Sequence, residues 1–309
     1  MPDKAVVIFG ASGFIGFNLH LHFKEKIKNI YLVSSSTRVL NDAKFISFDE
    51  LDQISLPQDT VAINVAACRY NASKHHSFKS HICLENTKMY SQFFDWCVRK
   101  NINEVRFASS IAVYTGSKTL LDDTVDIDYS LLPSKTESLY GTSKRIAEIL
   151  AKAYHEEYGI NSLMFRFSNP YGPYDCQDYT KAHVLPALIM KALNSKTQLQ
   201  VLGNMQASRD FIFIDDICNI FEKSLSMTNV NDSFNVATGS NITIEDLAKL
   251  IIRYTNNNLS ILNEGNATSS VVERFCKVEK LKKLLNIKEF TSLETGLRKT
   301  IEWYKNVKN

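Results

Sequence analysis

The sequence predicts an α/β protein built on a doubly wound parallel sheet, with a smaller C-terminal α/β lobe. Apolar segments typical of buried strands alternate with segments of helical periodicity as far as residue 167, which is the pattern of a parallel sheet with helices on both faces. Beyond Pro173 the alternation becomes irregular. Because a chain of 309 residues is long enough for two lobes, we expect the second to begin near this proline.

Residues 5–16, with the sequence AVVIFGASGFIG, are predicted to form the first strand, a tight turn and the start of a helix. A phosphate binds at a helix N-terminus only where backbone N–H groups point at it and no side chain blocks its approach, so the three glycines suit a pyrophosphate. The motif follows a Val/Ile run and therefore predicts a Rossmann-type dinucleotide-binding domain; a glycine-rich turn without a ligand is the alternative. The expected cofactor contacts here are Gly10, Ser12, Gly13, Phe14, Ile15 and Gly16.

The other elements follow in order along the chain. Short apolar runs predict the strands, and apolar residues at helical spacing predict the helices. Thr243 followed by Asp246 is typical of a helix N-terminus. Strands are expected at 30–33, 44–48, 61–65, 105–108, 161–167 and 210–214. Helices are expected at 17–23, 84–100, 140–158, 184–193, 243–254 and 293–305.

Charge and hydropathy exclude several classes of protein. The net charge is +3, with 36 basic and 33 acidic residues, so no clustered basic face predicts binding to nucleic acid or to a membrane surface. No apolar run approaches the ~18–20 residues of a membrane span, and the first residues lead directly into a strand without a signal-peptide pattern. We expect a cytoplasmic protein.

Cysteines and histidines do not predict a metal site. The six cysteines are widely scattered, with no C-x-x-C pair, so we interpret them as reduced and mostly buried thiols. His75 and His76 are adjacent but have no partner ligands nearby in the sequence. We interpret them as a solvated loop pair and predict no metal.

The segment after the second strand bears on the choice of cofactor. An acidic residue there would bind the adenosine ribose and repel a 2′-phosphate, but the residues from Ser34 to Arg38 are SSSTR. Hydroxyls and a guanidinium favour NADP over NAD, with a solvated loop charge as the alternative for Arg38. Further expected cofactor contacts are Ser34, Ser35, Arg38, Asp49 (or a helix cap), Ala66 and Ala67.

A tyrosine and a lysine four residues apart on a helix share one face, and the ammonium favours the phenolate. Such a tyrosine can exchange a proton with a hydroxyl as hydride leaves or reaches the same carbon. The spacing occurs four times, at Tyr70/Lys74, Tyr114/Lys118, Tyr140/Lys144 and Tyr304/Lys308. Only Tyr140/Lys144 opens the long helix after the strand that delivers Ser109 and Ser110 to the same sheet edge, so we predict that this pair is catalytic.

Five motifs together resemble the extended short-chain dehydrogenase/reductases, and within them the nucleotide-sugar epimerase/dehydratase family of UDP-glucose 4-epimerase type. The resemblance covers essentially the whole chain, including the C-terminal stretch from 281 to 304. The motifs are GASGFIG at 10–16, SSIAVY at 109–114, YGTSK at 140–144, NPYGP at 169–173 and RDFIFIDDI at 209–217.

The resemblance implies a role for each matching residue. Tyr140 is the acid/base, Lys144 its electrostatic partner, and Ser110, four residues before Tyr114, the hydroxyl that holds the sugar oxygen. Tyr140 and Lys144 would also contact the cofactor. The implied contacts to the sugar-nucleotide diphosphate are Asn169, Arg209 and Arg274, with a surface charge as the alternative for Arg274, and Asn86 would order the active-site helix.

The resemblance also implies a domain plan and an assembly. A dinucleotide-binding Rossmann domain would comprise residues 1–168 and about 208–237, and a nucleotide-sugar-binding lobe residues 169–207 and 238–309. The expected partner besides the nucleotide-sugar substrate is a second copy of the chain. This homodimer would form through the helices near 84–100 and 140–158.

Departures from the family pattern reduce the set of reactions that the sequence supports. Ile111 and Ala112 stand where dehydratases carry an acidic pair, which argues against dehydration; Asn204 and Met205 replace an acidic-glycine step. The remaining reaction is hydride transfer at a sugar carbon, expected to be C4. Family frequency favours an epimerase, whereas the SSSTR segment favours an NADPH-dependent 4-ketosugar reductase. We narrowly predict the epimerase, with the reductase as the alternative and a non-catalytic NAD(P)-sensing module as the remote alternative.

Overall fold

The computed structural model describes residues 4–35, 43–68, 79–116, 119–134, 138–255, 258–264 and 273–308. The chain forms two compact units, each assembled from separate segments. The first comprises Met1–Thr115, Val125–Phe167 and Cys218–Phe234, and the second Gly116–Thr124, Ser168–Ile217 and Asn235–Asn309. The predicted division into a cofactor domain and a substrate lobe concerns function and stays a prediction.

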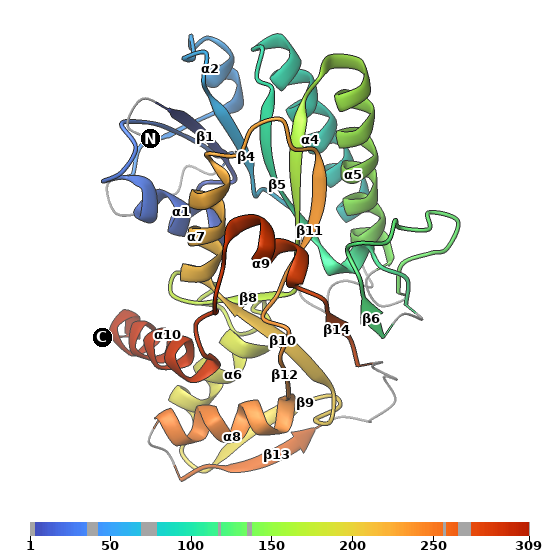
Figure 1. Cartoon of the computed structure of the whole chain (residues 1–309). Helices are drawn as coiled ribbons and strands as arrows, with labels where there is room; N and C mark the ends of the chain where they lie inside the picture. The colour runs from blue at the N-terminus through green and yellow to red at the C-terminus, as the bar shows by residue number, and fades with distance from the viewer. Residues whose placement is uncertain are drawn as a thin grey trace. The chain divides into compact units, whose positions relative to one another are not determined.

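A seven-stranded sheet runs through the described part of the first unit, in the order β11-β7-β5-β4-β1-β2-β3 (Figure 1). Parallel pairs join β1 to β2 and β4, β2 to β3, β4 to β5, and β5 to β7. The strand order reverses between β1 and β4, as in a doubly wound sheet, which confirms the predicted fold class. The strands are β1 (Ala5–Phe9), β2 (Asn29–Val33), β3 (Phe45–Ile46), β4 (Val61–Asn64), β5 (Glu104–Ser110), β7 (Asn161–Phe167) and β11 (Asp232–Val236).

Helices cover both faces of this sheet. Helices α4 and α5 pack against each other on one face, and α1 and α7 lie on the other (Figure 1). Strands covered on both faces are apolar throughout rather than alternating, which is why the apolar runs predicted them. The helices are α1 (Phe14–Phe23), α2 (Phe48–Asp52), α4 (Lys79–Arg99), α5 (Ser138–Tyr158) and α7 (Ile214–Ser224).

Alternate side chains of one strand serve the two faces, because successive residues of a strand point in opposite directions. Met164 of β7 packs in the cluster under α4 and α5. The rings of Phe165 and Phe167, on the opposite face of β7, lie 5.2 and 6.2 Å from the ring of Phe221 on α7. Strand β7 is therefore fixed from both sides.

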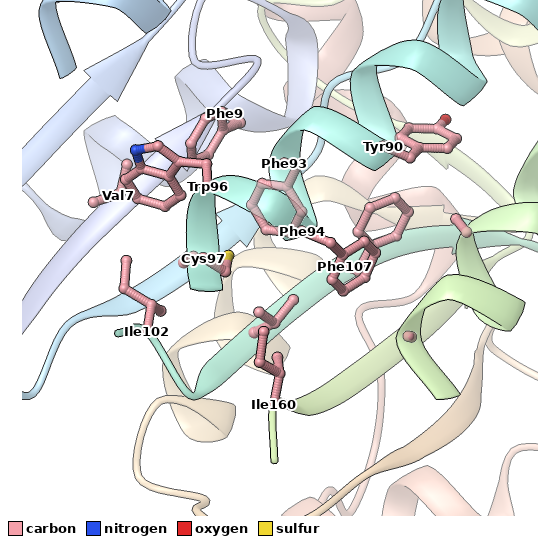
Figure 2. Packing of buried hydrophobic residues seen from close by; sticks show 14 of the residues in the cluster. Val7, Phe9, Tyr90, Phe93, Phe94, Trp96, Cys97, Ile102, Phe107 and Ile160 are labelled. Atoms are coloured by element: carbon pink, nitrogen blue, oxygen red, sulfur yellow. The ribbon is translucent and has the colours of Figure 1, made fainter. Parts of the chain in front are cut away.

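Aromatic rings form the core beneath α4 (Figure 2). The ring of Phe9 lies 5.0 Å from those of Phe93 and of Trp96, and the ring of Phe107 lies 5.0 Å from that of Tyr90. All five rings are buried, and each such side chain contributes about 2 kcal/mol by leaving water. This packing fixes α4 against β1 and β5.

The second unit has three small sheets in its described residues, in the orders β12-β10-β8, β13-β9 and β14-β6. The predicted cap of α8 is present, because the Thr243 hydroxyl accepts a hydrogen bond from the Asp246 N–H at 3.0 Å. The strands are β6 (Leu120–Leu121), β8 (Asn169–Tyr171), β9 (Gln198–Leu202), β10 (Ser208–Phe213), β12 (Asn241–Thr243), β13 (Ser260–Glu264) and β14 (Phe275–Cys276). The helices are α6 (Val184–Asn194), α8 (Ile244–Thr255), α9 (Glu279–Leu285) and α10 (Leu293–Lys308).

The prediction of a strand over 44–48 is wrong beyond residue 46. The Ser47 hydroxyl accepts a hydrogen bond from the Glu50 N–H at 3.2 Å, and the Glu50 carboxylate accepts one from the Ser47 N–H at 2.6 Å. This reciprocal capping box starts α2 at Phe48. Asp49 therefore lies exposed in the first turn of α2 rather than at a strand end, and Ser47 is the cap.

Candidate active site

The glycine turn between β1 and α1 has the geometry that close approach requires. Gly10 has φ +80°, and a Cβ there would lie 2.7 Å from the backbone of Ala66. A Cβ on Gly16 would overlap the carbonyl oxygen of Gly10. Side chains at these two positions are therefore excluded, and the turn holds the start of α1 close to the end of β4.

The N-terminus of α1 fits a pyrophosphate. Gly13 is the exposed N-cap residue, no side chain caps the helix, and its first turn holds no acidic residue. Ser12 precedes this cap, and the half-buried Phe14 and Ile15 begin the helix. Backbone N–H groups at an uncapped helix start favour an anion, so the arrangement suits a dinucleotide phosphate.

Two hydroxyls meet where β2 ends. The Ser34 N–H donates to the Ile46 carbonyl at 3.0 Å, which continues the β2–β3 pairing, and its Oγ lies 2.6 Å from the Oγ of Ser12. Ser35 is exposed. The predicted contact Arg38 lies outside the described residues.

The segment after β4 packs against the glycine turn at Gly10. The Asn64 side-chain oxygen accepts a hydrogen bond from the Ala66 N–H at 3.0 Å. Ala66 is half-buried against Gly10, and Ala67 is exposed. The two alanines thus lie beside the turn in which we expect the cofactor.

Tyr140 and Lys144 lie in the first two turns of α5, where the sequence predicts them. Both are buried, and the Lys144 Nζ donates to the carbonyl of Ala108 on β5 at 2.5 Å. Ser110 ends β5, and its Oγ accepts a hydrogen bond from the Ala112 N–H at 3.2 Å. The three predicted catalytic residues therefore come from two adjoining elements of the first unit.

Asn86 of α4 connects the helix start to the segment after β4. Its side chain accepts a hydrogen bond from the Cys68 N–H at 2.7 Å and donates to the Cys68 carbonyl at 3.0 Å. It also donates to the Ser143 hydroxyl at 3.3 Å, which in turn donates to the Tyr140 carbonyl at 2.8 Å. This chain of contacts orders the first turn of α5.

A buried ion pair lies one turn beyond Lys144, and sequence reasoning missed it. The Glu148 carboxylate accepts hydrogen bonds from Arg166 at 2.7 and 2.9 Å and from the Ser109 hydroxyl at 2.6 Å. Arg166 also donates to the Tyr114 hydroxyl at 3.0 Å. Burial lowers the pKa of Arg166, but the adjacent Glu148 carboxylate outweighs burial and raises that pKa overall. The sequence signal for Glu148 was the spacing of four residues, which continues from Tyr140 and Lys144 to Glu148 and places all three on one face of α5.

The predicted diphosphate contacts belong to the second unit. Asn169 of β8 donates its side-chain amide to the carbonyl of Asp210 at 2.8 Å. Arg209 of β10 is half-buried and donates to the Ser208 carbonyl at 2.7 Å. Arg274 is half-buried just before β14, and its carbonyl accepts a hydrogen bond from the Asn241 side chain at 3.0 Å.

Two of the other tyrosines at this spacing have identified structural partners. Tyr114 accepts from Arg166 as described, and the Tyr304 hydroxyl donates to the carbonyl of Cys176 at 2.7 Å. Both are buried. Tyr70, Lys74 and Lys118 lie outside the described residues.

The described part of the chain holds no metal-binding cluster and no membrane-spanning helix. There, no three His, Cys, Asp or Glu side chains gather as they would around a metal ion; His75 and His76 lie outside it. All six cysteines are described and carry free thiols, and Cys97, Cys218 and Cys276 are buried. None of the helices searched combines the length and apolar composition that a bilayer crossing needs.

The uncapped glycine turn on a doubly wound sheet, with a buried tyrosine–lysine pair at its edge, defines a nucleotide-dependent enzyme of the dehydrogenase type. The model of the NAD dependent epimerase/dehydratase family matches residues 6–237. The chain belongs to this family, and it is an NAD(P)-dependent enzyme of the extended short-chain dehydrogenase/reductase type.

Individual relatives include both reductases and epimerases. The chain is 23% identical to the dTDP-4-dehydro-6-deoxy-D-allose reductase of a Streptomyces species, over 98% of this chain and 96% of the relative. It is 28% identical to the dTDP-4-dehydro-6-deoxyglucose reductase of Escherichia coli, over 80% of this chain and 81% of the relative. The solved UDP-glucose 4-epimerase of Thermotoga maritima, with UDP-glucose, is similar with a TM-score of 0.86 and 20% identity, over 99% of this chain and 100% of that one.

Proposed function

We propose that the protein is an NADPH-dependent reductase of nucleotide-diphosphate 4-ketosugars. The observation that carries the choice is the Ser12–Ser34 hydroxyl pair at the end of β2, where a carboxylate would favour NAD. Two curated relatives are named as reductases of 4-dehydro sugars, which supports the same choice. Together these features favour the reductase over the epimerase that family frequency alone favours.

The proposed chemistry is one hydride transfer and one proton transfer. NADPH, when bound at the glycine turn, supplies the hydride that reaches the C4 carbonyl carbon. Tyr140 donates its phenolic proton to the carbonyl oxygen, and the Lys144 ammonium stabilises the phenolate that remains. Ser110 donates its hydroxyl hydrogen to the same oxygen, because a carbonyl oxygen can only accept, and the Ser110 oxygen accepts from the Ala112 N–H. The products are the C4 alcohol and NADP⁺.

Binding of the substrate is assigned to the second unit. Asn169, Arg209 and Arg274 are proposed contacts to the diphosphate, because guanidinium groups and amides suit phosphate oxygens. The Thermotoga maritima neighbour was solved with UDP-glucose, which supports a sugar nucleotide as the substrate class.

An epimerase is the second candidate, and the match to the epimerase/dehydratase family model favours it. The same three side chains serve both reactions, because an epimerase would oxidise C4 and then reduce it on the opposite face. The two proposals differ in cofactor: an epimerase retains NAD and shows no net oxidation, whereas a reductase exchanges NADPH and consumes one per sugar.

The first experiment denatures the purified protein and identifies the nucleotide that is released. Oxidation of NADPH and of NADH is then assayed with UDP- and dTDP-4-keto-6-deoxyglucose. Stoichiometric NADPH consumption supports the reductase. Retained NAD together with interconversion of UDP-glucose and UDP-galactose would refute the reductase and support the epimerase.

Tyr140→Phe tests the assignment of Tyr140 as the proton donor. We expect turnover to fall by about 10²–10⁴-fold, because the proton donor is lost, while cofactor affinity stays within a few-fold of the wild type. Unchanged turnover would contradict the site assignment. Wild-type protein that binds NADPH but converts no sugar nucleotide would instead favour the cofactor-sensing module.

A further inference from the structure

Three aromatic rings surround the ammonium group of Lys144. Its Nζ lies 4.8 Å from the ring centroid of Tyr90, 5.1 Å from that of Phe107 and 5.8 Å from that of Tyr140. Lys144, Tyr90 and Phe107 are almost completely buried. A cation within about 6 Å of a ring face is attracted by the ring, more strongly when water is excluded.

Tyr90 is held by its ring rather than by its hydroxyl. The ring packs edge-on against Phe107 at 5.0 Å and 78° (Figure 2). Its buried hydroxyl has no hydrogen-bond partner among the described residues. Burial raises the pKa of Tyr90 well above its usual value, and the nearby Tyr140 and Cys68 raise it further. Tyr90 thus presents a neutral ring to the ammonium.

Tyr90 shares a face of α4 with Asn86, four residues earlier. Asn86 orders the first turn of α5 through Ser143, and Tyr90 contacts the ammonium one turn further along α5. Two successive turns of α4 therefore contact two successive turns of the active-site helix.

We infer that Tyr90 is a positioning residue for the proposed reaction, seating the Lys144 ammonium, with Phe107, in its charged form beside Tyr140. A buried ammonium loses hydration, which favours the neutral amine. The ring faces and the Ala108 carbonyl offset that loss. A charged Lys144 in turn favours ionisation of Tyr140, so the ring of Tyr90 acts on the proton donor through the lysine.

Other titratable groups of the described residues lie around this site. Tyr140 lies on α5 itself, Tyr90 on α4, and Cys68 follows β4 close to Tyr90. Glu148 is one turn further along α5, where Arg166 pairs with it. The carboxylate is thus compensated, and removal of a ring changes the environment of the ammonium directly.

The test compares Tyr90→Phe, which keeps the ring, with Tyr90→Leu, which removes it. Tyrosinate absorbance is titrated in each background with and without Tyr140→Phe, so that the difference reports Tyr140 alone. We expect the midpoint of Tyr140 to rise by roughly half to one pH unit in Tyr90→Leu and to stay unchanged in Tyr90→Phe. The basic limb of the reductase pH profile should move upward by the same amount.

Phe93→Leu is the matched control, because Phe93 is a buried ring of the same helix and cluster without a recorded contact to the ammonium. It should lower stability without moving the Tyr140 midpoint. If Tyr90→Leu does not fold, Tyr90→Met preserves more volume and carries the same expectation. An unchanged midpoint in the ring-deleting variant, or an equal shift in Tyr90→Phe, overturns the inference.

The inference rests on the proposed function only for its kinetic consequence. The absorbance titration needs no substrate, so the midpoint shift can be measured whatever reaction the enzyme catalyses. A shift without turnover of any 4-ketosugar would refute the proposed reductase and leave the role of Tyr90 intact. Turnover of a 4-ketosugar without a shift of the Tyr140 midpoint would support the reductase and refute the role of Tyr90.

Discussion

Glu148 is a residue on which several buried polar contacts near the candidate site converge. Its carboxylate pairs with Arg166 and accepts from Ser109, the neighbour of Ser110. The side chains of Glu148 and Arg166 are only 2% and 6% exposed. A buried charge that loses its partner costs far more than the pair contributes, so this network is sensitive to single substitutions.

We expect Glu148→Gln to lower the free energy of unfolding by about 3 kcal/mol, because Arg166 is left buried without a countercharge. Turnover should also fall, since the Gln amide keeps one acceptor oxygen but turns an NH2 group toward Arg166 or Ser109, which disturbs the contacts that hold the end of β5. Urea unfolding and steady-state kinetics measure the two effects. The double variant Glu148→Leu/Arg166→Met should be more stable than Glu148→Gln; a double variant that is less stable would contradict this account.

Residues at the site differ in how far the sequence alone could predict them. Gly10, Tyr140 and Ser110 were predictable because strand ends and a helix start deliver them to one sheet edge. Tyr90 was not, since a buried aromatic at helical spacing looks the same whether it packs on leucine or on an ammonium. Glu148 of α5 was also missed, because its partner Arg166 lies on another element, β7.

At the scale of elements, continuous apolar strands were predictable and short strands were not. β4 and β7 are buried on both faces, so their composition alone predicts them. β6 and β14 have two residues each and exist only because they pair with each other from distant parts of the chain. The end of β3 is decided by the Ser47 cap, a local hydrogen bond that an apolar pattern does not reveal.

The pair of β6 and β14 has an acid-sensitive contact. Lys277, next to β14, bonds the Asp122 carboxylate, next to β6, at 2.6 Å. That bond and those from Thr124 lower the pKa of Asp122 to about 2, from an ordinary 3.8. A carboxyl with a lowered folded-state pKa stabilises the fold above its unfolded pKa, and this stabilisation is lost as pH falls from about 4 to about 2.

We therefore expect Asp122→Asn to lower the urea midpoint slightly at pH 6 and to match the wild type near pH 2. The effect is small because the contact is largely solvated. Urea unfolding at the two pH values measures it. A difference between the two proteins that persisted near pH 2 would contradict the assignment of this contact.

At the scale of the whole molecule, we propose a homodimer through α4 and α5. Leu84 of α4 and Ile149 and Tyr158 of α5 are 53%, 46% and 52% exposed. Large apolar side chains left in water on two packed helices are suited to a partner surface. A second copy would bury them by apposing the same two helices.

Ile149→Glu should shift the protein from dimer to monomer, because a charge placed in an apolar interface loses its hydration. Light scattering after size exclusion measures the mass. Val307→Glu is the control, since Val307 is 45% exposed on α10, outside the proposed interface. A monomeric wild type would refute the dimer, and a dimeric Ile149→Glu would place the interface elsewhere.

Some hydrogen-bond partners of Arg106, on β5, are synthesised much later than Arg106 itself. Its fully buried guanidinium donates at 2.8 and 3.0 Å to the carbonyl of Ser224, the last residue of α7, and to the carbonyl of Met227 beyond it. A ribosome makes Arg106 long before these carbonyls, and the intervening stretch includes Ser168–Ile217 of the second unit. Glu104 of the same strand pairs with Arg106 at 3.1 Å, so the countercharge is made early. The carbonyls that complete the hydrogen bonding of the buried guanidinium become available only after residue 227 has emerged.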